Sequence, residues 1–200
     1  MKTSIKTALL LNGSKKFGSD GTRLNHTLQN IAKEELKAMG YNTLETILDA
    51  GYTPQEELEK ILQSQLIIYQ MPAWWMGEPW IVKKYIDEVY WLGVGTLFRN
   101  DGRSRKDPSK KYGSGGLAQD KKVMLSVTWN APKEAFTECD NFFEGVGVEG
   151  VYLHLRKAHE FCAMEWLPIF MCNNVLKDPH IEEYISAYKA HLREYCSTAY

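Results

Sequence analysis

The residues best suited to chemistry lie in three short segments, each directly after a run of apolar residues. The first segment, residues 12–22, contains three glycines and three hydroxyl side chains, and a helical pattern follows it. Backbone N–H groups at the start of a helix, aided by hydroxyls and a lysine such as Lys15, bind phosphate well. The segment matches neither the Walker A nor the GxGxxG pattern, so a phosphate site and an ordinary connection both stay open.

Indole side chains mark the second and third segments. The second segment, residues 70–80, contains Trp74, Trp75 and Trp80. Loops normally face water, and exposing indole surface costs roughly 25 cal/mol per Å². These side chains therefore cover the core, a dimer partner or a planar ligand. The third segment, residues 128–132, sets an indole beside an amide that can both donate and accept hydrogen bonds.

Together, the three segments suit a flat ring system with polar edges, such as isoalloxazine, which needs apolar walls and a few N–H donors. We expect the backbone of Trp129 and Asn130 to provide ring-edge donors. A fourth segment, residues 101–116, is rich in Gly, Lys, Arg and Ser. Its basic side chains either face solvent or attract the phosphates of a pyridine nucleotide. Its Tyr112 is predicted to donate near O2 of a flavin and to close over the ring.

Alternating strands and helices must position these segments. Apolar runs predict strands over residues 6–12, 42–48, 66–71 and 122–128 and within 167–172. Helical periodicity and capping signals predict helices over residues 24–39, 54–63, 79–89, near 134–142 and after 179, with some irregular strand within 131–165. This alternation predicts one flavodoxin-like α/β domain over residues 1–200, a doubly wound five-stranded parallel sheet with helices on both faces. In that strand order, the loops after the first, third and fourth strands meet.

Bulk properties exclude several classes of function. The formal net charge of -1 argues against a general nucleic-acid or membrane-surface binder. The sequence contains no apolar run near the roughly 20 residues that span a bilayer, and no secretory signal at residues 1–6. The four cysteines lack CxxC spacing and the five histidines lack zinc-site spacing, so we expect no metal and a reducing cytoplasm.

Five motifs carry a family resemblance. They are N-G-S-K-K-F-G (residues 12–18), Q-M-P-A-W-W-M-G-E-P-W (70–80), D-G-R-S-R-K-D-P-S-K-K-Y-G-S-G-G (101–116), T-W-N-A-P-K-E-A-F (128–136) and G-V-G-V-E-G-V-Y-L (145–153). The chain resembles the modulator of drug activity B family, which are NADPH:quinone reductases among the flavodoxin-like quinone reductases. The resemblance covers nearly the whole chain.

The resemblance implies a homodimer with one non-covalent FAD per subunit near the interface. NADPH would deliver hydride to flavin N5, and a quinone would then take it in a ping-pong sequence, in defence against quinone and oxidative stress. The residues implied or expected to contact the cofactor are Lys15, Ser19, Asp20, Arg23, Leu24, Asn25, Thr27, Pro72, Ala73, Trp74, Trp75, Met76, Tyr112, Gly113, Thr128, Trp129, Asn130 and Ala131. Residues 19–23 differ in type from the family pattern, so contacts at Asp20 or Arg23 would rest on backbone groups.

Other functions stay open at this point. A flavodoxin-like electron carrier usually displays a strongly acidic face, whereas this chain is nearly neutral. A flavin-binding regulatory module would bind the cofactor without turnover. An FMN-dependent azo- or nitroreductase would differ in the flavin. The sequence shows no side chain with an evident acid–base role, and solvent can supply the quinol protons.

Overall fold

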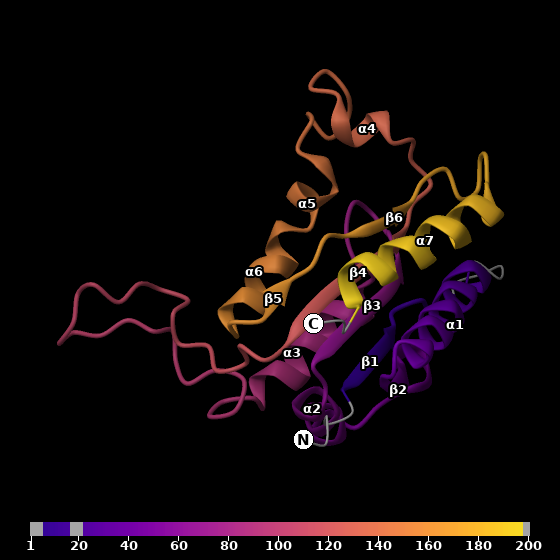
Figure 1. Ribbon diagram of the computed structural model, residues 1–200. Coiled ribbons are helices and arrows are strands. Elements are labelled where there is room, and N and C mark those ends of the chain that lie inside the picture. Colours follow the sequence, from indigo (N-terminus) through magenta and orange to yellow (C-terminus); the bar gives the residue numbers. More distant parts are fainter. Residues whose placement is uncertain (1–5, 17–21, 198–200) are drawn as a thin grey trace.

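A computed structural model describes residues 6–16 and 22–197. Its strands form one parallel sheet in the order β2-β1-β3-β4, with β5 and β6 both paired to β4 (Figure 1). The strands are β1 (Thr7–Asn12), β2 (Asn42–Ile47), β3 (Leu66–Pro72), β4 (Lys122–Thr128), β5 (Glu165–Trp166) and β6 (Phe170–Cys172). The predicted flavodoxin-like sheet is confirmed, and its fifth position is divided between β5 and β6. Pro168, which has no N–H for a ladder, lies between these two pieces.

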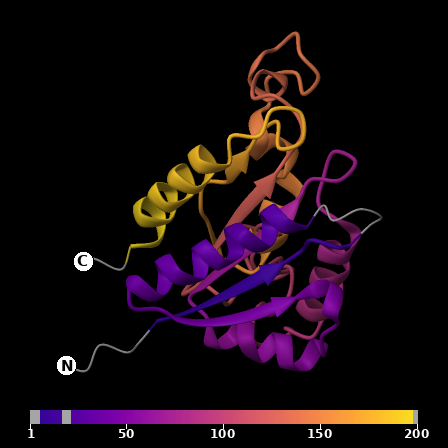
Figure 2. The same cartoon turned by 90° about the vertical axis from the view of Figure 1, so that its right-hand side faces the viewer.

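Helices cover both faces of the sheet, as predicted. The α-helices are α1 (Arg23–Ala38), α2 (Pro54–Gln63), α3 (Trp80–Trp91), α4 (Glu134–Thr137), α5 (Gly147–Val151), α6 (Leu153–Phe161) and α7 (Ile181–Cys196), and the 3-10 turn η1 spans Leu48–Ala50. Helices α1 and α7 pack side by side on one face, and α2 and α3 lie on the other (Figure 2). This arrangement requires both faces of the central strands to be apolar.

Strand β1 shows how the sequence produces these two layers. Side chains alternate across a strand, so Ala8 and Leu10 face the α1–α7 layer, whereas Leu9 and Leu11 face the α2–α3 layer. All four side chains are buried. Because every position of the strand meets a helix, the sequence reads as a continuous apolar run instead of an alternating one.

Three local expectations differ from the structure. Thr53 precedes α2 with Pro54 at the first helical position, but its side chain makes no capping hydrogen bond. Of the irregular strand expected within residues 131–165, the described residues show only Glu165, where β5 begins. The expected helix is α4, and two further helices, α5 and α6, fill the rest of the stretch. Helix α4 ends at Thr137, short of the predicted 142. Gly145, Gly147 and Gly150 interrupt the helical periodicity here. Short helices in this stretch are therefore difficult to predict from the sequence.

A long segment projects from the edge of the sheet where the strands begin. Residues 99–116, here called the arm, lie between α3 and the first residue of β4 and project away from the body of the molecule (Figure 1). The arm's two limbs touch closely: a Cβ on Gly115 would lie 2.0 Å from the Asn100 carbonyl oxygen. In the described part of the chain, no helix is long and apolar enough to cross a membrane.

Candidate functional site

The three predicted loops meet at the carboxyl edge of the sheet. Gly13 N–H donates to the Gln70 carbonyl over 2.8 Å, which ties the loop after β1 to the last residues of β3. Ala73 N–H donates to the Thr128 carbonyl over 2.9 Å, which joins the loops after β3 and β4. Position 13 has no room for a side chain, because a Cβ there would lie 2.4 Å from Cγ2 of Val82 on α3. The convergence expected from the strand order is therefore confirmed.

A buried amide cluster underlies these loops. The Asn25 amide donates to Oγ1 of Thr128 over 3.1 Å, and the Gln70 amide donates to Oδ1 of Asn25 over 2.9 Å. All three side chains are buried. Hydrogen bonds in such a dry place hold α1, β3 and β4 in one register. Oε1 of Gln70 is buried and has no hydrogen-bond partner among the described residues.

The loop after β1 is shaped by two short-range contacts. Oδ1 of Asn12 accepts from both the backbone N–H and the hydroxyl of Ser14. The Lys15 ammonium pairs with Asp49, just beyond β2, and the Lys16 N–H donates to the same carboxylate over 3.2 Å. These two donors hold the pKa of Asp49 below its usual range. Lys15 was expected to meet phosphate, and its charge is here already partnered.

The start of α1 accounts for the remaining residues predicted near a phosphate. Ser19 and Asp20 lie outside the described residues. Arg23 opens α1 with an exposed side chain, and Leu24 is half-buried. Thr27 is exposed on the outer face of the helix, one turn beyond the start. Of this group, the structure brings Asn25 to the carboxyl edge; Arg23 and Thr27 are solvent-facing.

The loop after β3 presents an unusual turn. Trp74 and Gly77 exchange both backbone hydrogen bonds, at 2.9 and 3.1 Å, so Trp75 and Met76 occupy the two central positions of a tight hairpin. Their φ angles are +43° and +67°. Such turns favour Asn and Gly, and a bulky residue with positive φ costs on the order of 1 kcal/mol or more. The turn leaves the Trp75 side chain 97% exposed. An indole this exposed, on a turn with this backbone cost, is a candidate contact for a ligand or a partner.

A side-chain pair attaches this loop to α6. Nε2 of His154 lies 2.8 Å from Oε2 of Glu78, whose side chain is only 10% exposed. Burial raises the pKa of the nearby Tyr152 phenol, and the Glu78 charge raises it further. The Tyr152 hydroxyl has no hydrogen-bond partner among the described residues. Sequence reasoning missed Glu78, His154, Asp49 and Gln70, and only Gln70, a polar residue near the end of an apolar strand, gave a signal.

The loop after β4 corrects one prediction. The Trp129 indole is buried and packs edge-on against Phe136, Phe143 and Tyr152, with ring centroids 4.9 to 5.9 Å apart. Its backbone N–H donates to the Cys172 carbonyl over 2.8 Å. This N–H is therefore committed to the neighbouring strand and is not a free ring-edge donor. The indole is part of the core.

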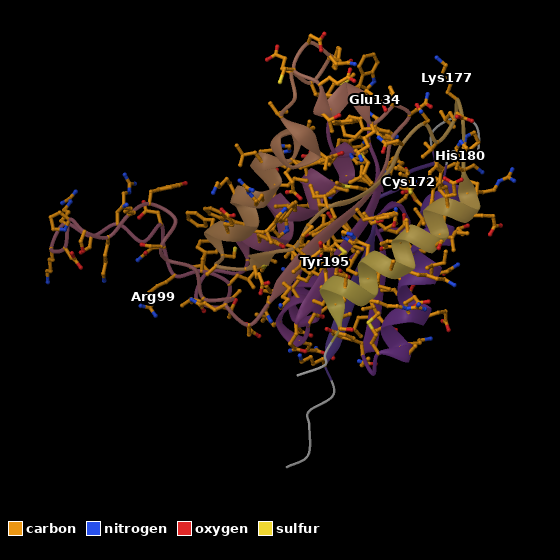
Figure 3. The ribbon with its side chains drawn as sticks, turned by 45° about the horizontal axis from the view of Figure 1, so that its top comes forward. Arg99, Glu134, Cys172, Lys177, His180 and Tyr195 are labelled. Carbon is orange, nitrogen blue, oxygen red and sulfur yellow. The ribbon has the colours of Figure 1, made fainter. Side chains whose placement is uncertain are left out.

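The residues after Trp129 are tied to the loop after β6. Oδ1 of Asn130 accepts from the backbone N–H groups of Leu176 and Lys177, at 3.1 and 3.0 Å. The Ala131 carbonyl accepts from the Asn174 N–H over 3.1 Å. Figure 3 labels Cys172 and Lys177 on this stretch, beside the amino end of α7. The loop is thus fixed from both sides before any ligand binds.

Tyr112 lies far from this edge. It belongs to the arm, which joins the sheet at the amino end of β4 (Figure 1). Its ring packs against Phe161, at the end of α6, with centroids 5.6 Å apart, and the Arg103 guanidinium lies 5.6 Å from the ring centroid. The side chain is 70% exposed. The expectation that the Tyr112 loop closes over the other three loops is wrong within one chain, and Gly113 lies outside the site with it.

Comparisons with known proteins agree with this architecture. A family model described as flavodoxin-like fold matches residues 6–196. The NADPH:quinone oxidoreductase MdaB of Haemophilus influenzae is 53% identical over 186 residues, covering 93% of this chain and 97% of that protein. An uncharacterised protein of Schizosaccharomyces pombe is 47% identical over 191 residues, covering 96% and 97%. The chain belongs to the flavodoxin-like family and, within it, to the group that includes MdaB, as the sequence resemblance predicted.

Solved structures support the fold at lower identity. A Klebsiella pneumoniae protein provisionally named a quinone reductase has a TM-score of 0.73 at 22% identity, with 94% of this chain and 83% of that chain covered. General stress protein 14 of Treponema denticola, solved in complex with FMN, has a TM-score of 0.63 at 17% identity, with 94% and 97% covered. At these identities the likeness shows a shared fold.

Proposed function

We propose that this chain is an NAD(P)H:quinone oxidoreductase that works with non-covalent FAD at the carboxyl edge of the sheet. The observation that carries the proposal is the buried cluster of Asn25, Gln70 and Thr128, which holds the three loops together and retains an unpartnered acceptor at Gln70. A relative of similar length and 53% identity is named for this activity. The cluster fits a planar cofactor with polar edges, because such a ring needs fixed polar groups beside apolar walls.

The residues at this edge have separable tasks in the proposal. The turn built by Asn12 and Ser14 presents backbone groups to a phosphate, and Asp49 keeps that turn in place through Lys15. The Trp74–Gly77 hairpin holds the Trp75 indole outward, where it covers one side of the pocket and excludes water. The backbone of Asn130 and Ala131 lines the opposite side. The bound flavin supplies hydride transfer from NADPH to quinone in two half-reactions; the protein supplies orientation and electrostatics.

A homodimer completes this proposal. The phenol of Tyr112 cannot reach the carboxyl edge of its own chain, but a two-fold partner can bring its arm to that edge. Two features favour this arrangement: the exposed Tyr112 on the arm and the exposed Trp75 at the carboxyl edge. Each would be covered by the other subunit. The partner's Tyr112 would then donate toward the ring edge that gains negative charge on reduction.

The test is a flavin and turnover assay on the purified chain. We expect a yellow protein whose flavin, released by heat and separated by chromatography, is FAD. Under anaerobic conditions NADPH should bleach the flavin and a menadione-type or ubiquinone-type quinone should restore its colour, with no partner protein. A colourless protein that cannot be reconstituted with FAD would overturn the proposal. Release of FMN would correct the cofactor and favour an azoreductase-like enzyme.

The same assay separates the rival functions. An electron carrier would need a partner protein to be reduced, and a regulatory module would bind flavin that NADPH does not bleach. Parallel titrations with NADH and NADPH would decide the donor. The role proposed for the enzyme, removal of quinones by full two-electron reduction in oxidative stress, predicts that no semiquinone accumulates during turnover with excess quinone.

A further inference from the structure

The Trp74–Gly77 hairpin is held on both sides by contacts with other elements. On one side, the Ala73 N–H donates to the Thr128 carbonyl at the end of β4. On the other side, Glu78 pairs with His154 over 2.8 Å, across 76 positions of sequence. The two central residues have positive φ angles, and such a backbone persists only where its surroundings hold it in place. The shape of the hairpin therefore depends on contacts such as the one between Glu78 and His154.

The Glu78 carboxylate needs this partner. Its side chain is only 10% exposed, whereas the His154 side chain is 51% exposed. Burying a carboxylate is costly unless the group is paired and hydrogen-bonded. Loss of the imidazole would therefore favour movement of the carboxylate into water, and the adjoining end of the hairpin would move with it. Pro79 strengthens this coupling, because the residue before a proline is largely confined to extended backbone.

The pair lies at the same edge of the sheet as the proposed flavin site. Helix α6 runs from the carboxyl edge toward the arm (Figure 1). At its far end, Phe161 contacts Tyr112 of the arm. At its start, Tyr152 packs against Trp129, the first residue after β4, with ring centroids 5.9 Å apart. His154 is on the first turn of α6 and thus links the loop after β3 to a helix start beside the loop after β4.

The charge of His154 acts mainly on Glu78. Its ring also lies near Tyr152, with centroids 6.4 Å apart. Among the described residues, the lysines of α3 and the basic side chains of α6 pair within their own helices, and Glu149 on α5 accepts from the Trp166 indole. An imidazole changes charge between about pH 5 and pH 8. The contact is thus an ion pair at the acid end of this range and a weaker hydrogen bond at the alkaline end.

We propose that Glu78 and His154 form a latch that positions the Trp74–Gly77 hairpin for the quinone-reducing half-reaction. This inference rests on the proposed function in one respect, the place of Trp75 beside the quinone pocket. Both members of the latch are positioning residues, which act through the hairpin. An intact latch keeps the indole over the pocket, so it lowers the KM for quinone and leaves flavin reduction by NADPH unchanged. Because protonated His154 pairs more strongly, the KM for quinone rises from about pH 6 to about pH 8.

Hydrogen exchange tests the latch without any turnover. The variants Glu78→Gln and His154→Gln keep polar side chains and remove the charged pair. In each variant the Trp74 and Gly77 amides, which bond to each other's carbonyls, should exchange at least about threefold faster than in the wild type. Asp87→Asn, which removes an exposed ion pair within α3, is the matched control and should exchange as the wild type does. Unchanged exchange at the hairpin in either latch variant would overturn the proposal.

Steady-state kinetics with a menadione-type quinone tests the role of the latch in the reaction. At about pH 6, each latch variant should raise the KM for quinone at least about threefold, with flavin content and anaerobic bleaching by NADPH unchanged. The KM of His154→Gln should not vary with pH, unlike that of the wild type. The double variant should raise the KM no further than the stronger single variant, since the two side chains act through one contact. Asp87→Asn should keep the wild-type KM.

The outcomes separate the latch from the proposed function. A wild-type KM in both latch variants, or a pH dependence of KM that persists in His154→Gln, would overturn the role of the latch in quinone reduction. A wild-type protein that binds no flavin would overturn the proposed function and with it that role. The exchange rates at the hairpin would still decide whether Glu78 and His154 hold it.

Discussion

At the carboxyl edge of the sheet, buried side chains from α1, β3 and β4 bond to one another, whereas the arm bonds almost entirely to itself. Asn25 joins Gln70 and Thr128 across long sequence separations. The arm is held by short-range turns, such as the Arg103 N–H donating to Asp101 over 2.9 Å, and by the contact of Tyr112 with Phe161. The difference separates an edge that is organised within one chain from an arm for which we propose a place in a partner's site.

The largest expected effect is the loss of stability when a core tryptophan is replaced. Trp129→Ala should lower the free energy of unfolding by about 3–5 kcal/mol, because the indole fills an aromatic cluster in the core. Trp91→Ala, at a side chain that is 76% exposed, is the matched control and should change it by less than about 0.5 kcal/mol. Urea unfolding of the flavin-free protein gives both values. Equal effects would mean that Trp129 does not pack as described.

The second effect concerns the buried amide cluster. Asn25→Leu leaves the Gln70 amide and the Thr128 hydroxyl without their partner, which should cost about 1–3 kcal/mol of stability. Flavin affinity should fall at least about tenfold with it, since the loops lose their common register. Asn30→Leu, at an exposed position of the same helix, serves as the control in unfolding and flavin titration. Equal flavin affinity of the two variants would mean that the amide cluster does not organise the flavin site.

A pH effect arises from a histidine in the core between α6 and the sheet. His159 is fully buried, and burial lowers its pKa to about 4. Its Nδ1 lies 2.7 Å from the Leu155 carbonyl and its Nε2 lies 3.3 Å from the Tyr69 hydroxyl, so the neutral ring is the bonded form. The unfolded chain takes up a proton near pH 6.5 and the folded chain does not. Stability is therefore complete above about pH 6.5 and falls as the pH drops toward 4.

At pH 5 this loss should reach about 2 kcal/mol relative to pH 7.5. His159→Gln should be less stable at pH 7.5 but should show a flatter pH dependence in urea unfolding. His180 is the control, because it is exposed and the neighbouring Asp178 raises its pKa. His180→Gln should therefore keep the acid-dependent loss seen in the wild type. An unchanged slope in His159→Gln would assign the loss to other groups.

The smallest effect on stability is expected at Trp75. Trp75→Ala removes a side chain that is 97% exposed and should change the free energy of unfolding by less than about 0.5 kcal/mol. Relief of the positive φ does not occur, since alanine meets the same backbone cost. If the indole covers the ring and quinone pocket, the KM for quinone should rise several-fold with little change in flavin content. A variant with wild-type KM and kcat would remove Trp75 from the site.

Much of the framework could be predicted from local patterns. The bounds of β4 agree with the predicted run of residues 122–128, because a strand buried on both faces reads as an unbroken apolar segment. The meeting of the three loops followed from the strand order alone. The buried Asn25 and Thr128 were also among the predicted cofactor contacts, and the structure places them together.

The remaining features depend on contacts between distant segments, which residue type does not reveal. Trp129 lies in a loop whose residue types suit a ligand site, yet its indole packs against Phe136 on α4 and Tyr152 between α5 and α6. The sequence did not reveal these contacts. Tyr112 is of a residue type that suits a flavin site. It lies far from the carboxyl edge because the arm leads into β4 at the amino end of that strand. A pattern can thus suggest a site residue without revealing where the fold places its side chain.

The most direct measurement of the central claim, a site completed by the partner's arm, is subunit complementation. Tyr112→Ala and Asn25→Leu chains with different affinity tags are co-expressed, and the heterodimer is isolated. Each homodimer should be poorly active, one lacking the phenol and the other the preorganised edge. In the heterodimer, the intact edge of the Tyr112→Ala chain receives Tyr112 from the other subunit, so NADPH:quinone turnover should return to about half of the wild-type value. A heterodimer no more active than its parents, or a Tyr112→Ala homodimer with full activity, would contradict the account.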